Sequence, residues 1–215
     1  EISCFARGEK IMENETQMYF ATNPDAKHDE HLINYQLDEL SLQFYTDAGV
    51  FSKTRVDYGS CVLLKVLKQL EISGNILDVG TGYGPLGLFA AKLWPKSRVT
   101  MIDVNERALA LAKRNAQLNE IDNVNIFSSD CYRNLDEQEQ FGLILTNPPI
   151  RAGKQVVDDI LQNAKKYLQV GGILLVVIQK KQGAPSAKKC LEQTYGNCEI
   201  LKRDKGYYIL KSVKK

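Results

Sequence analysis

One twelve-residue stretch, ILDVGTGYGPLG at positions 76–87, constrains the fold of this 215-residue chain more than any other. Its apolar residues Ile76, Leu77 and Val79 are typical of a short buried parallel strand. The glycines that follow permit a tight turn with no Cβ to keep a ligand away, and Pro85 suits the first turn of a helix. A strand, a glycine-rich turn and a helix in this order predict the ligand-binding crevice of an open α/β sheet.

Two kinds of ligand fit this crevice on sequence grounds. Gly82, Gly84 and Gly87 match the dinucleotide spacing G-x-G-x-x-G, but that match alone is a weak signal. Asp78, near the carboxyl end of the strand, would repel a pyrophosphate and attract a ligand that carries an ammonium and a sulfonium group. The run D-x-G-x-G-x-G that Asp78 begins is the motif I signature of class I methyltransferases. We therefore predict S-adenosylmethionine as the cofactor, bound in part by Asp78, Gly80, Gly82 and Gly84.

Composition and cysteine usage indicate a single globular domain in a reducing compartment. The chain is 44% hydrophobic and 25% charged, which is ordinary for a domain with a large core. No apolar run approaches the roughly 20 residues of a membrane span, and no secretory signal pattern opens the sequence. Scattered cysteines without a C-x-x-C pair favour free thiols and a cytoplasmic location; they are Cys4, Cys61, Cys131, Cys190 and Cys198. We predict no metal site.

Charge is unevenly distributed along the sequence, although the formal net charge is only +2. Residues 1–150 contain 14 Lys and Arg against 21 Asp and Glu, a balance of −7. Residues 151–215 contain 14 against 5, a balance of +9. This asymmetry suggests a basic face toward a polyanion, and a solvated lysine surface is an equally weighted alternative.

The apolar pattern predicts alternating strands and helices behind an N-terminal extension. Residues 1–17 are polar, so we expect a flexible leader, then one domain over 18–215. Residues 18–58 of that domain are expected to hold a hairpin and a cofactor-covering loop, and residues 59–215 the core. The expected hairpin covers 32–46 and turns at Asp38-Glu39, although Asp-Glu is not the best turn dipeptide. Strands are expected at 76–79, 98–102, 124–127, 141–145, 173–178, 199–201 and 207–213, and helices at 59–70, 86–93, 106–118, 156–168 and 185–195.

This alternation predicts an α/β fold of the class I methyltransferase, Rossmann-like type. We expect a seven-stranded, mostly parallel sheet with helices on both faces. The last two strands form a hairpin that adds an antiparallel C-terminal strand, and the N-terminal β-hairpin is an extension of the core. The segment 131–140 is polar and is expected to be irregular.

Acidic residues follow two further strands and can complete a nucleoside site. Asp103 comes 21 residues after Gly82, where a carboxylate can accept hydrogen bonds from both ribose hydroxyls. Asp130, after the next strand, can accept a hydrogen bond from the adenine amino group. An acid at a helix start and a surface acid are the corresponding structural alternatives. We predict both residues as cofactor ligands.

The segment Asn147-Pro148-Pro149 is the most specific stretch for the reaction. Two prolines fix the backbone and remove two N–H donors, so the local carbonyls face outward unpaired. The Asn147 amide oxygen and the Pro148 carbonyl then form a double acceptor for a planar exocyclic amine, and proximity supplies the rest. We predict all three residues as catalytic, with Asn147 also near the cofactor. An Asn147→Asp variant, which keeps an acceptor oxygen, should then retain more activity than Asn147→Ala.

Four segments together resemble the small-methyltransferase-domain family: DAGVFS at 47–52, DYGS at 57–60, the motif I stretch, and NPPI at 147–150. The likeness runs from about Asn23 to the last residue. This family includes the ribosomal RNA small-subunit methyltransferase C enzymes, which make N2-methylguanine. The resemblance implies a class I fold, S-adenosylmethionine as donor and an RNA guanine as acceptor. It also implies that Phe51 and Ser52 help to close the cofactor pocket.

Two features depart from the family pattern. Longer members carry a second, degenerate copy of the domain, which these 215 residues lack, so RNA docking is expected to differ. Many amino-methylating relatives have an aromatic residue after the prolines, where this chain has Ile150, so another residue must sandwich the base. We expect substrate contacts at Ile150, Arg151, Lys180 and Lys181.

The favoured hypothesis is an S-adenosylmethionine-dependent N-methyltransferase that forms N2-methylguanine in small-subunit ribosomal RNA. Its expected partner is ribosomal RNA or the small ribosomal subunit, and a monomer and a homodimer are both compatible with the sequence. One alternative is the same chemistry on an adenine of DNA or RNA, or on a protein glutamine amide. Another is a non-catalytic S-adenosylmethionine- or RNA-binding module, which would need a broken Asn-Pro-Pro site; the site is intact.

Overall fold

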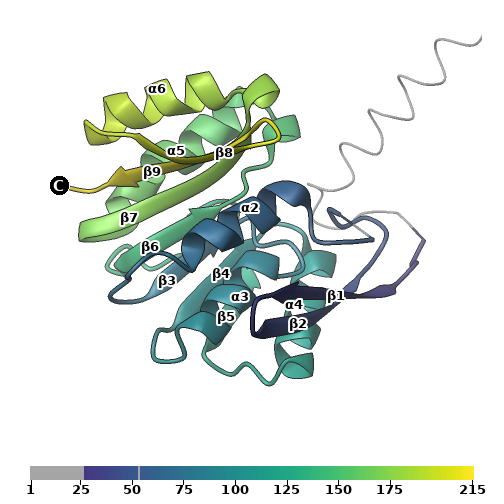
Figure 1. Cartoon of the computed structure of the whole chain (residues 1–215). Helices are drawn as coiled ribbons and strands as arrows, with labels where there is room; N and C mark the ends of the chain where they lie inside the picture. The colour runs from purple at the N-terminus through teal and green to yellow at the C-terminus, as the bar shows by residue number, and fades with distance from the viewer. Residues whose placement is uncertain (1–26, 53) are drawn as a thin grey trace, which may run out of the picture.

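The computed structural model describes residues 27–52 and 54–215, and Figure 1 shows how their helices and strands are arranged. The predicted leader, and residue 18 where we expect the domain to begin, lie outside the described residues. The described elements are, in order, β1 (His31–Leu37), β2 (Leu40–Thr46), α2 (Tyr58–Leu67), β3 (Ile76–Val79), α3 (Pro85–Leu93), β4 (Val99–Asp103), α4 (Glu106–Leu118), β5 (Val124–Ser128), β6 (Phe141–Thr146), η1 (Ile150–Ala152), α5 (Lys154–Tyr167), β7 (Leu168–Gln179), η2 (Lys180–Gln182), α6 (Ala184–Tyr195), β8 (Glu199–Asp204) and β9 (Tyr207–Val213).

A seven-stranded sheet in the order β5-β4-β3-β6-β7-β9-β8 forms the centre of the molecule. Strand β3 pairs in parallel with β4 on one side and with β6 on the other, and β5 and β7 extend the parallel sheet. Strand β9 runs antiparallel to both β7 and β8. The chain thus builds outward from β3 to β5, then returns to β6, which makes the β4-β3-β6 region the topological switch point. The predicted class I methyltransferase fold is confirmed.

Each face of the sheet packs against its own layer of helices. Helices α2, α3 and α4 and the N-terminal hairpin contribute to one hydrophobic core, and α5 and α6 contribute to the other. Figure 1 shows α5 and α6 on the opposite side of the sheet from α3 and α4. The fully buried strand β3 supplies both cores, because Ile76 faces the first and Leu77 and Val79 face the second.

The N-terminal hairpin has the predicted position and turn. Strands β1 and β2 pair antiparallel from His31 opposite Thr46 to Leu37 opposite Leu40, as a separate two-stranded sheet. Alternation places Ile33, Leu42 and Phe44 in the core, and α4 holds the outer backbone of β2 through Asn115 and Asn119. The bonds are Tyr45 N to Asn115 Oδ1 at 2.7 Å and Gln43 N to Asn119 Oδ1 at 2.9 Å. These side chains at the C-terminal end of α4 therefore attach β2 to the core domain.

Three element boundaries differ from the prediction by three residues or more, each for a local reason. Helix α2 ends at Leu67 rather than residue 70, because the amides of Gln69 and Leu70 bond carbonyls three residues back in a tighter turn. Strand β7 begins at Leu168 rather than residue 173, with a register shift between Phe141 and Leu143 opposite its glycines. Strand β8 reaches Asp204 because its polar end pairs with β9.

The segment 131–140 and the cysteines also follow the prediction in the described residues. Residues 131–140 contain turns, as predicted, yet bury Tyr132 and Leu135 in the core on the α5 side. The predicted free thiols are present at all four described cysteines, and Cys4 lies outside the described residues. Among the helices of the described ranges, none combines the length and apolar character needed to cross a bilayer.

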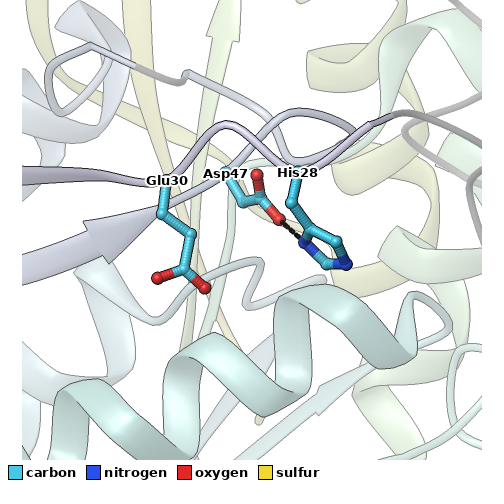
Figure 2. A group of neighbouring side chains, drawn as sticks. All are labelled: His28, Glu30 and Asp47. Carbon is cyan, nitrogen blue, oxygen red and sulfur yellow. Dashed lines mark hydrogen bonds and ion pairs between the residues drawn. The ribbon is translucent and has the colours of Figure 1, made fainter.

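Asp47 fastens the chain before β1 to the end of β2, as Figure 2 shows for its bond to His28. The buried carboxylate accepts hydrogen bonds from His28 Nδ1 at 2.5 Å, Asp29 N at 2.5 Å and Ala48 N at 2.7 Å. Arg107 Nη1 lies 3.9 Å away. Burial alone would raise the pKa of Asp47, but these bonds together lower it below its ordinary value.

We expect Asp47→Asn to lower the free energy of unfolding by about 1.5–3 kcal/mol at pH 7, the range for hydrogen bonds to a charged group. Because the folded pKa is lowered, this stabilisation is present above the ordinary pKa of about 4 and is lost as the pH falls through the folded pKa. Urea unfolding at pH 7 and pH 3 measures the difference. The exposed Asp122→Asn variant is the control, and an equal loss in both variants at pH 7 would contradict the assignment.

Candidate active site

The loop between β3 and α3 turns at the carboxyl edge of the sheet through three glycines with positive φ: +73° at Gly80, +57° at Gly82 and +98° at Gly84. A Cβ added to Gly80 or Gly82 would meet no atom within 4 Å. A Cβ on Gly84 would approach Leu88 and Met101 to 2.9 and 3.0 Å. The first two glycines therefore face open space, whereas the third permits close packing of α3 on β4.

Asp78 lies beneath this loop and is completely buried. Its Oδ2 accepts hydrogen bonds from Thr81 Oγ1 at 2.6 Å and Gly87 N at 2.9 Å, and its Oδ1 has no partner among the described residues. Burial raises the pKa of Asp78 to about 7 against the effect of these two bonds, and nearby Asp103 raises it further. The carboxylate thus ties β3 to α3 from below, and its direct contact with a cofactor stays a prediction.

Asp103 lies across the same loop at the end of β4. Its Oδ2 accepts a hydrogen bond from Gly82 N at 2.8 Å, and its Oδ1 accepts one from Asn105 N at 2.9 Å. Burial raises the pKa of Asp103, and these bonds oppose the rise. Asp103 and Gly82 are thus in direct contact at the mouth of the crevice. Each carboxylate oxygen keeps a further lone pair that can accept a ribose hydroxyl.

The segment that contains Phe51 and Ser52 is held against the N-terminal end of α4. Asn105 Nδ2 donates to Gly49 O at 3.0 Å, and Arg107 Nη1 donates to the adjacent Ala48 O at 2.7 Å. The backbone N–H of Asn105 also donates to Asp103 at the end of β4. The hydrogen bonds of Asn105 therefore bring the segment to the edge of the sheet where β4 ends. Phe51 is 54% exposed, and Ser52 has a φ of +60°. Their contact with a cofactor stays a prediction.

Asp130 is adjacent to this edge through its backbone but points its carboxylate to the surface. The preceding Ser129 donates its N–H to Asp103 O at 3.0 Å. Asp130 Oδ2 pairs with Arg133 Nη1 at 2.8 Å, and both side chains are more than half exposed. A role in binding adenine stays a prediction.

Asn147 directly follows β6, beside the glycine loop. Thr146 Oγ1 donates to Val79 O at 2.9 Å and ties the ends of β6 and β3 together. Asn147 Nδ2 donates to Asp57 Oδ2 and to Ser60 Oγ, each at 3.2 Å. No residue in the described ranges bonds Asn147 Oδ1. The amide is therefore held with its nitrogen toward the start of α2 and its oxygen left as an acceptor.

Asp57 and Ser60 are site residues that the sequence analysis did not assign. Asp57 also caps α2, because its Oδ1 accepts a hydrogen bond from Ser60 N at 3.2 Å. An aspartate just before an apolar helical pattern is a helix-start signal, so the cap could have been found from sequence. The hydrogen bond from Asn147 Nδ2 to Asp57 Oδ2 joins residues 90 positions apart, and no sequence signal predicts it.

The two prolines differ in the state of their carbonyl groups. Pro149 O accepts a hydrogen bond from Ala152 N at 2.9 Å as η1 begins. No group of the described residues bonds Pro148 O, so the expected unpaired carbonyl occurs at Pro148 and not at Pro149. The Asn147 amide oxygen and the Pro148 carbonyl are therefore both available as acceptors.

The four residues expected to contact substrate lie in two short 3-10 turns. Ile150 and Arg151 belong to η1 just after β6, and Lys180 and Lys181 belong to η2 at the end of β7. Because β6 and β7 are parallel neighbours, both turns lie at the carboxyl edge of the sheet. Ile150 is half-buried and the three basic residues are exposed. Their contact with substrate stays a prediction.

One group of side chains has the composition of a metal site. Atoms of His28, Glu30 and Asp47 lie within 4.8 Å of one another (Figure 2). Glu30 already binds Arg114 through two hydrogen bonds of 2.7 and 3.2 Å, and Asp47 accepts the three bonds described above. These partners explain the arrangement, and the group carries no metal assignment.

The raised pKa of Asp78 predicts a particular dependence of stability on pH. Between the unfolded value near 4 and about 7, the folded protein binds one more proton than the unfolded chain, so Asp78 makes stability fall as the pH rises through this interval and level off above it. Asp78→Asn removes this contribution. Urea unfolding should show the variant gaining stability relative to wild type, by a few kcal/mol at most, as the pH rises from 5 to 8. A difference that does not change with pH would contradict the assignment.

Comparison with known proteins shows the family of this chain. The Methyltransferase small domain model matches residues 41–211. The uncharacterized protein YbxB of Bacillus subtilis is 44% identical over 93% of this chain and 99% of its own length. Ribosomal RNA small subunit methyltransferase C of Erwinia tasmaniensis is 32% identical over 90% of this chain and 55% of its own length, so the chain spans about half of that relative.

A solved structure shares the fold. The 16S rRNA N2 G1207 methyltransferase of T. thermophilus, in complex with AdoMet and guanosine, superimposes with a TM-score of 0.78 at 24% identity. The match covers 89% of this chain and 52% of that one. From its motifs, from the family model over most of its length and from the YbxB likeness, the chain belongs to the methyltransferase small domain family.

Proposed function

We propose that this protein is a cytoplasmic, S-adenosylmethionine-dependent methyltransferase that forms N2-methylguanine in small-subunit ribosomal RNA. The observation that carries the proposal is the orientation of the Asn147 amide. Asp57 and Ser60 take both contacts on the amide nitrogen, each at 3.2 Å, so the oxygen points away from α2 as a fixed acceptor. The adjacent Pro148 carbonyl is a second acceptor on the same turn.

Two acceptors side by side suit an exocyclic amine that carries two N–H groups. The lone pair of such an amine is delocalised into the ring, and holding both N–H groups favours the pyramidal nitrogen that can attack. S-adenosylmethionine supplies a methyl group on a sulfonium sulfur; the N–C bond forms as the C–S bond breaks, and the nitrogen then loses one proton to solvent. Both acceptors bind more strongly as the nitrogen gains positive charge, so they stabilise the transition state more than the ground state.

The residues around the glycine loop fit this cofactor. The open space beside Gly80 and Gly82 can receive a ligand close to the backbone. Asp103 offers lone pairs to a ribose at the end of β4, and Asp78 places a buried oxygen without a partner, among the described residues, near where a cationic ligand would lie. The exposed ring of Phe51 can cover the nucleoside from the other side.

Surface charge and the relatives of this chain both support RNA as the molecule that receives the methyl group. Three exposed basic residues lie at the edge that carries Asn147: Arg151, Lys180 and Lys181. They belong to residues 151–215, whose formal net charge is +9. Phosphates can meet these side chains while one base enters the site. The relative and the solved structure named above are ribosomal RNA methyltransferases, and the solved one contains guanosine.

Asn147→Ala should lower the single-turnover rate of methyl transfer by about 100-fold or more, because it removes one preorganised acceptor. The substrate is small-subunit ribosomal RNA from cells that lack the protein, and the product nucleosides are identified by mass spectrometry. Cofactor affinity, measured by calorimetry, should barely change. Asn147→Asp should lose about as much as alanine, because its carboxylate would face Asp57. This reverses the expectation from sequence.

Pro148→Ala is the informative companion variant, because it keeps the carbonyl while releasing the backbone constraint, and it should lose less than Asn147→Ala. N2-methylguanosine is the expected product. Methylated adenosine, methylation confined to large-subunit RNA, or a near-normal rate in the Asn147→Ala variant would each contradict the proposal.

A further inference from the structure

A cavity of about 180 Å³ lies beside the Asn147-Pro148-Pro149 turn, on the α5 and α6 side of the sheet. Four apolar residues form its walls, one each from η1, α5, β7 and α6: Ile150, Val157, Ile178 and Ala187. Gln182 and Ser186 lie at its polar edge. Because Ile150 follows the two prolines directly, the cavity begins where the proposed site for the target amine ends.

The lining favours an uncharged flat ring over an ion. The one carboxylate in the lining, Asp158, is ion-paired with Lys154 one helical turn earlier, so the two charges balance. An apolar cavity of about 150 Å³ is large enough to bind benzene in another protein. A cavity of about 180 Å³ can therefore hold one six-membered ring, with Gln182 and Ser186 able to reach polar atoms at its edge.

Cations lie next to the mouth of this cavity. Lys180 and Lys181 precede Gln182 in η2 and are exposed, and neither forms an ion pair with a residue in the described ranges. A nucleotide offers both required chemistries, since its base is flat and apolar on its faces and its phosphate is anionic. A protein side chain would satisfy the walls but leave the two lysines without an anion.

We propose that this cavity binds the base of the nucleotide next to the target guanine, a pyrimidine in the tightest case, while its phosphate meets Lys180 and Lys181. The proposal rests on the proposed function, because it takes RNA as the substrate. Ile150 then has a role without an aromatic ring: it forms the wall between the target base and its neighbour. The site selects RNA by the nucleotide beside the modified one.

The test is equilibrium binding of labelled nine-nucleotide RNAs by fluorescence anisotropy, at fixed salt and with S-adenosylhomocysteine present. One RNA has a central guanosine among uridines, and two others have an abasic nucleotide directly 5′ or 3′ of that guanosine. With wild-type protein, one abasic RNA should bind about tenfold more weakly, in line with the contribution of one stacked base. Ala187→Leu, which fills the cavity, should weaken binding of the intact RNA by a similar factor. It should leave the affinity for that abasic RNA unchanged.

Ser186→Phe is a second variant with the same expected effect as Ala187→Leu. The exposed Ser186 lies at the cavity edge, and its replacement does not disturb the core. Gln193→Leu, at an exposed position of α6 outside the lining, is the matched control and should change nothing. Equal affinity of wild type for all three RNAs, or no measurable RNA binding, would overturn the proposal. If N2-methylguanosine still forms in the ribosomal RNA assay, only the cavity proposal fails; if it does not form, the proposed function fails.

Discussion

The parallel pairing of β3 with both β4 and β6 decides where every polar group of the site lies. This strand has four residues, all buried, and its neighbours β4 and β6 begin the two opposite halves of the sheet. Parallel strands bring their carboxyl ends to one edge, so the glycine loop, Asp103 and Asn147 meet there although they are far apart in sequence. The Thr146 to Val79 hydrogen bond then fixes the end of β6 against the end of β3.

Three carboxylates hold this edge in place by accepting hydrogen bonds from N–H and O–H groups. Asp78 binds the loop and α3 from below, and Asp103 binds the loop from the side. Asp57 joins the cap of α2 to the amide of Asn147. Each bond makes a group rigid before any ligand arrives, which is the condition for electrostatic preorganisation of a reaction centre. Burial raises the pKa of both Asp78 and Asp103, and the nearby Asp103 raises the pKa of Asp78 further.

Local patterns in the sequence predicted most of the fold and the outline of the site. Motif I, the strand-helix alternation and the alternating apolar residues of the N-terminal hairpin each have a short-range signature, and the elements form where these signatures place them. Boundaries that depend on tertiary pairing were less predictable, as the early start of β7 shows. Asp78 is a predicted cofactor ligand, and that contact stays a prediction. Its hydrogen bond from Gly87 N depends on how α3 packs and has no spacing signal in the sequence.

Long-range contacts account for the remaining differences. The bond from Asn147 to Asp57 spans 90 positions, and the cavity beside Ile150 draws its walls from four separate elements. Neither has a periodic or spacing signal. The expected effect of Asn147→Asp was reversed for the same reason, since only the fold reveals that a second carboxylate lies 3.2 Å from the amide nitrogen.

The proposed role of Asn147 requires Asp57 to act in methyl transfer through the Asn147 amide, and a double-mutant cycle of these two residues tests this coupling. Asp57→Ser keeps a residue that can cap α2 but is too short to reach the amide. Single-turnover rates are measured for wild type, both single variants and the double variant. We expect Asp57→Ser to slow wild type by about tenfold, as for one lost hydrogen bond, and to have no further effect when Asn147 is alanine. The same slowing in both backgrounds would show that Asp57 acts independently of Asn147 and would contradict the account.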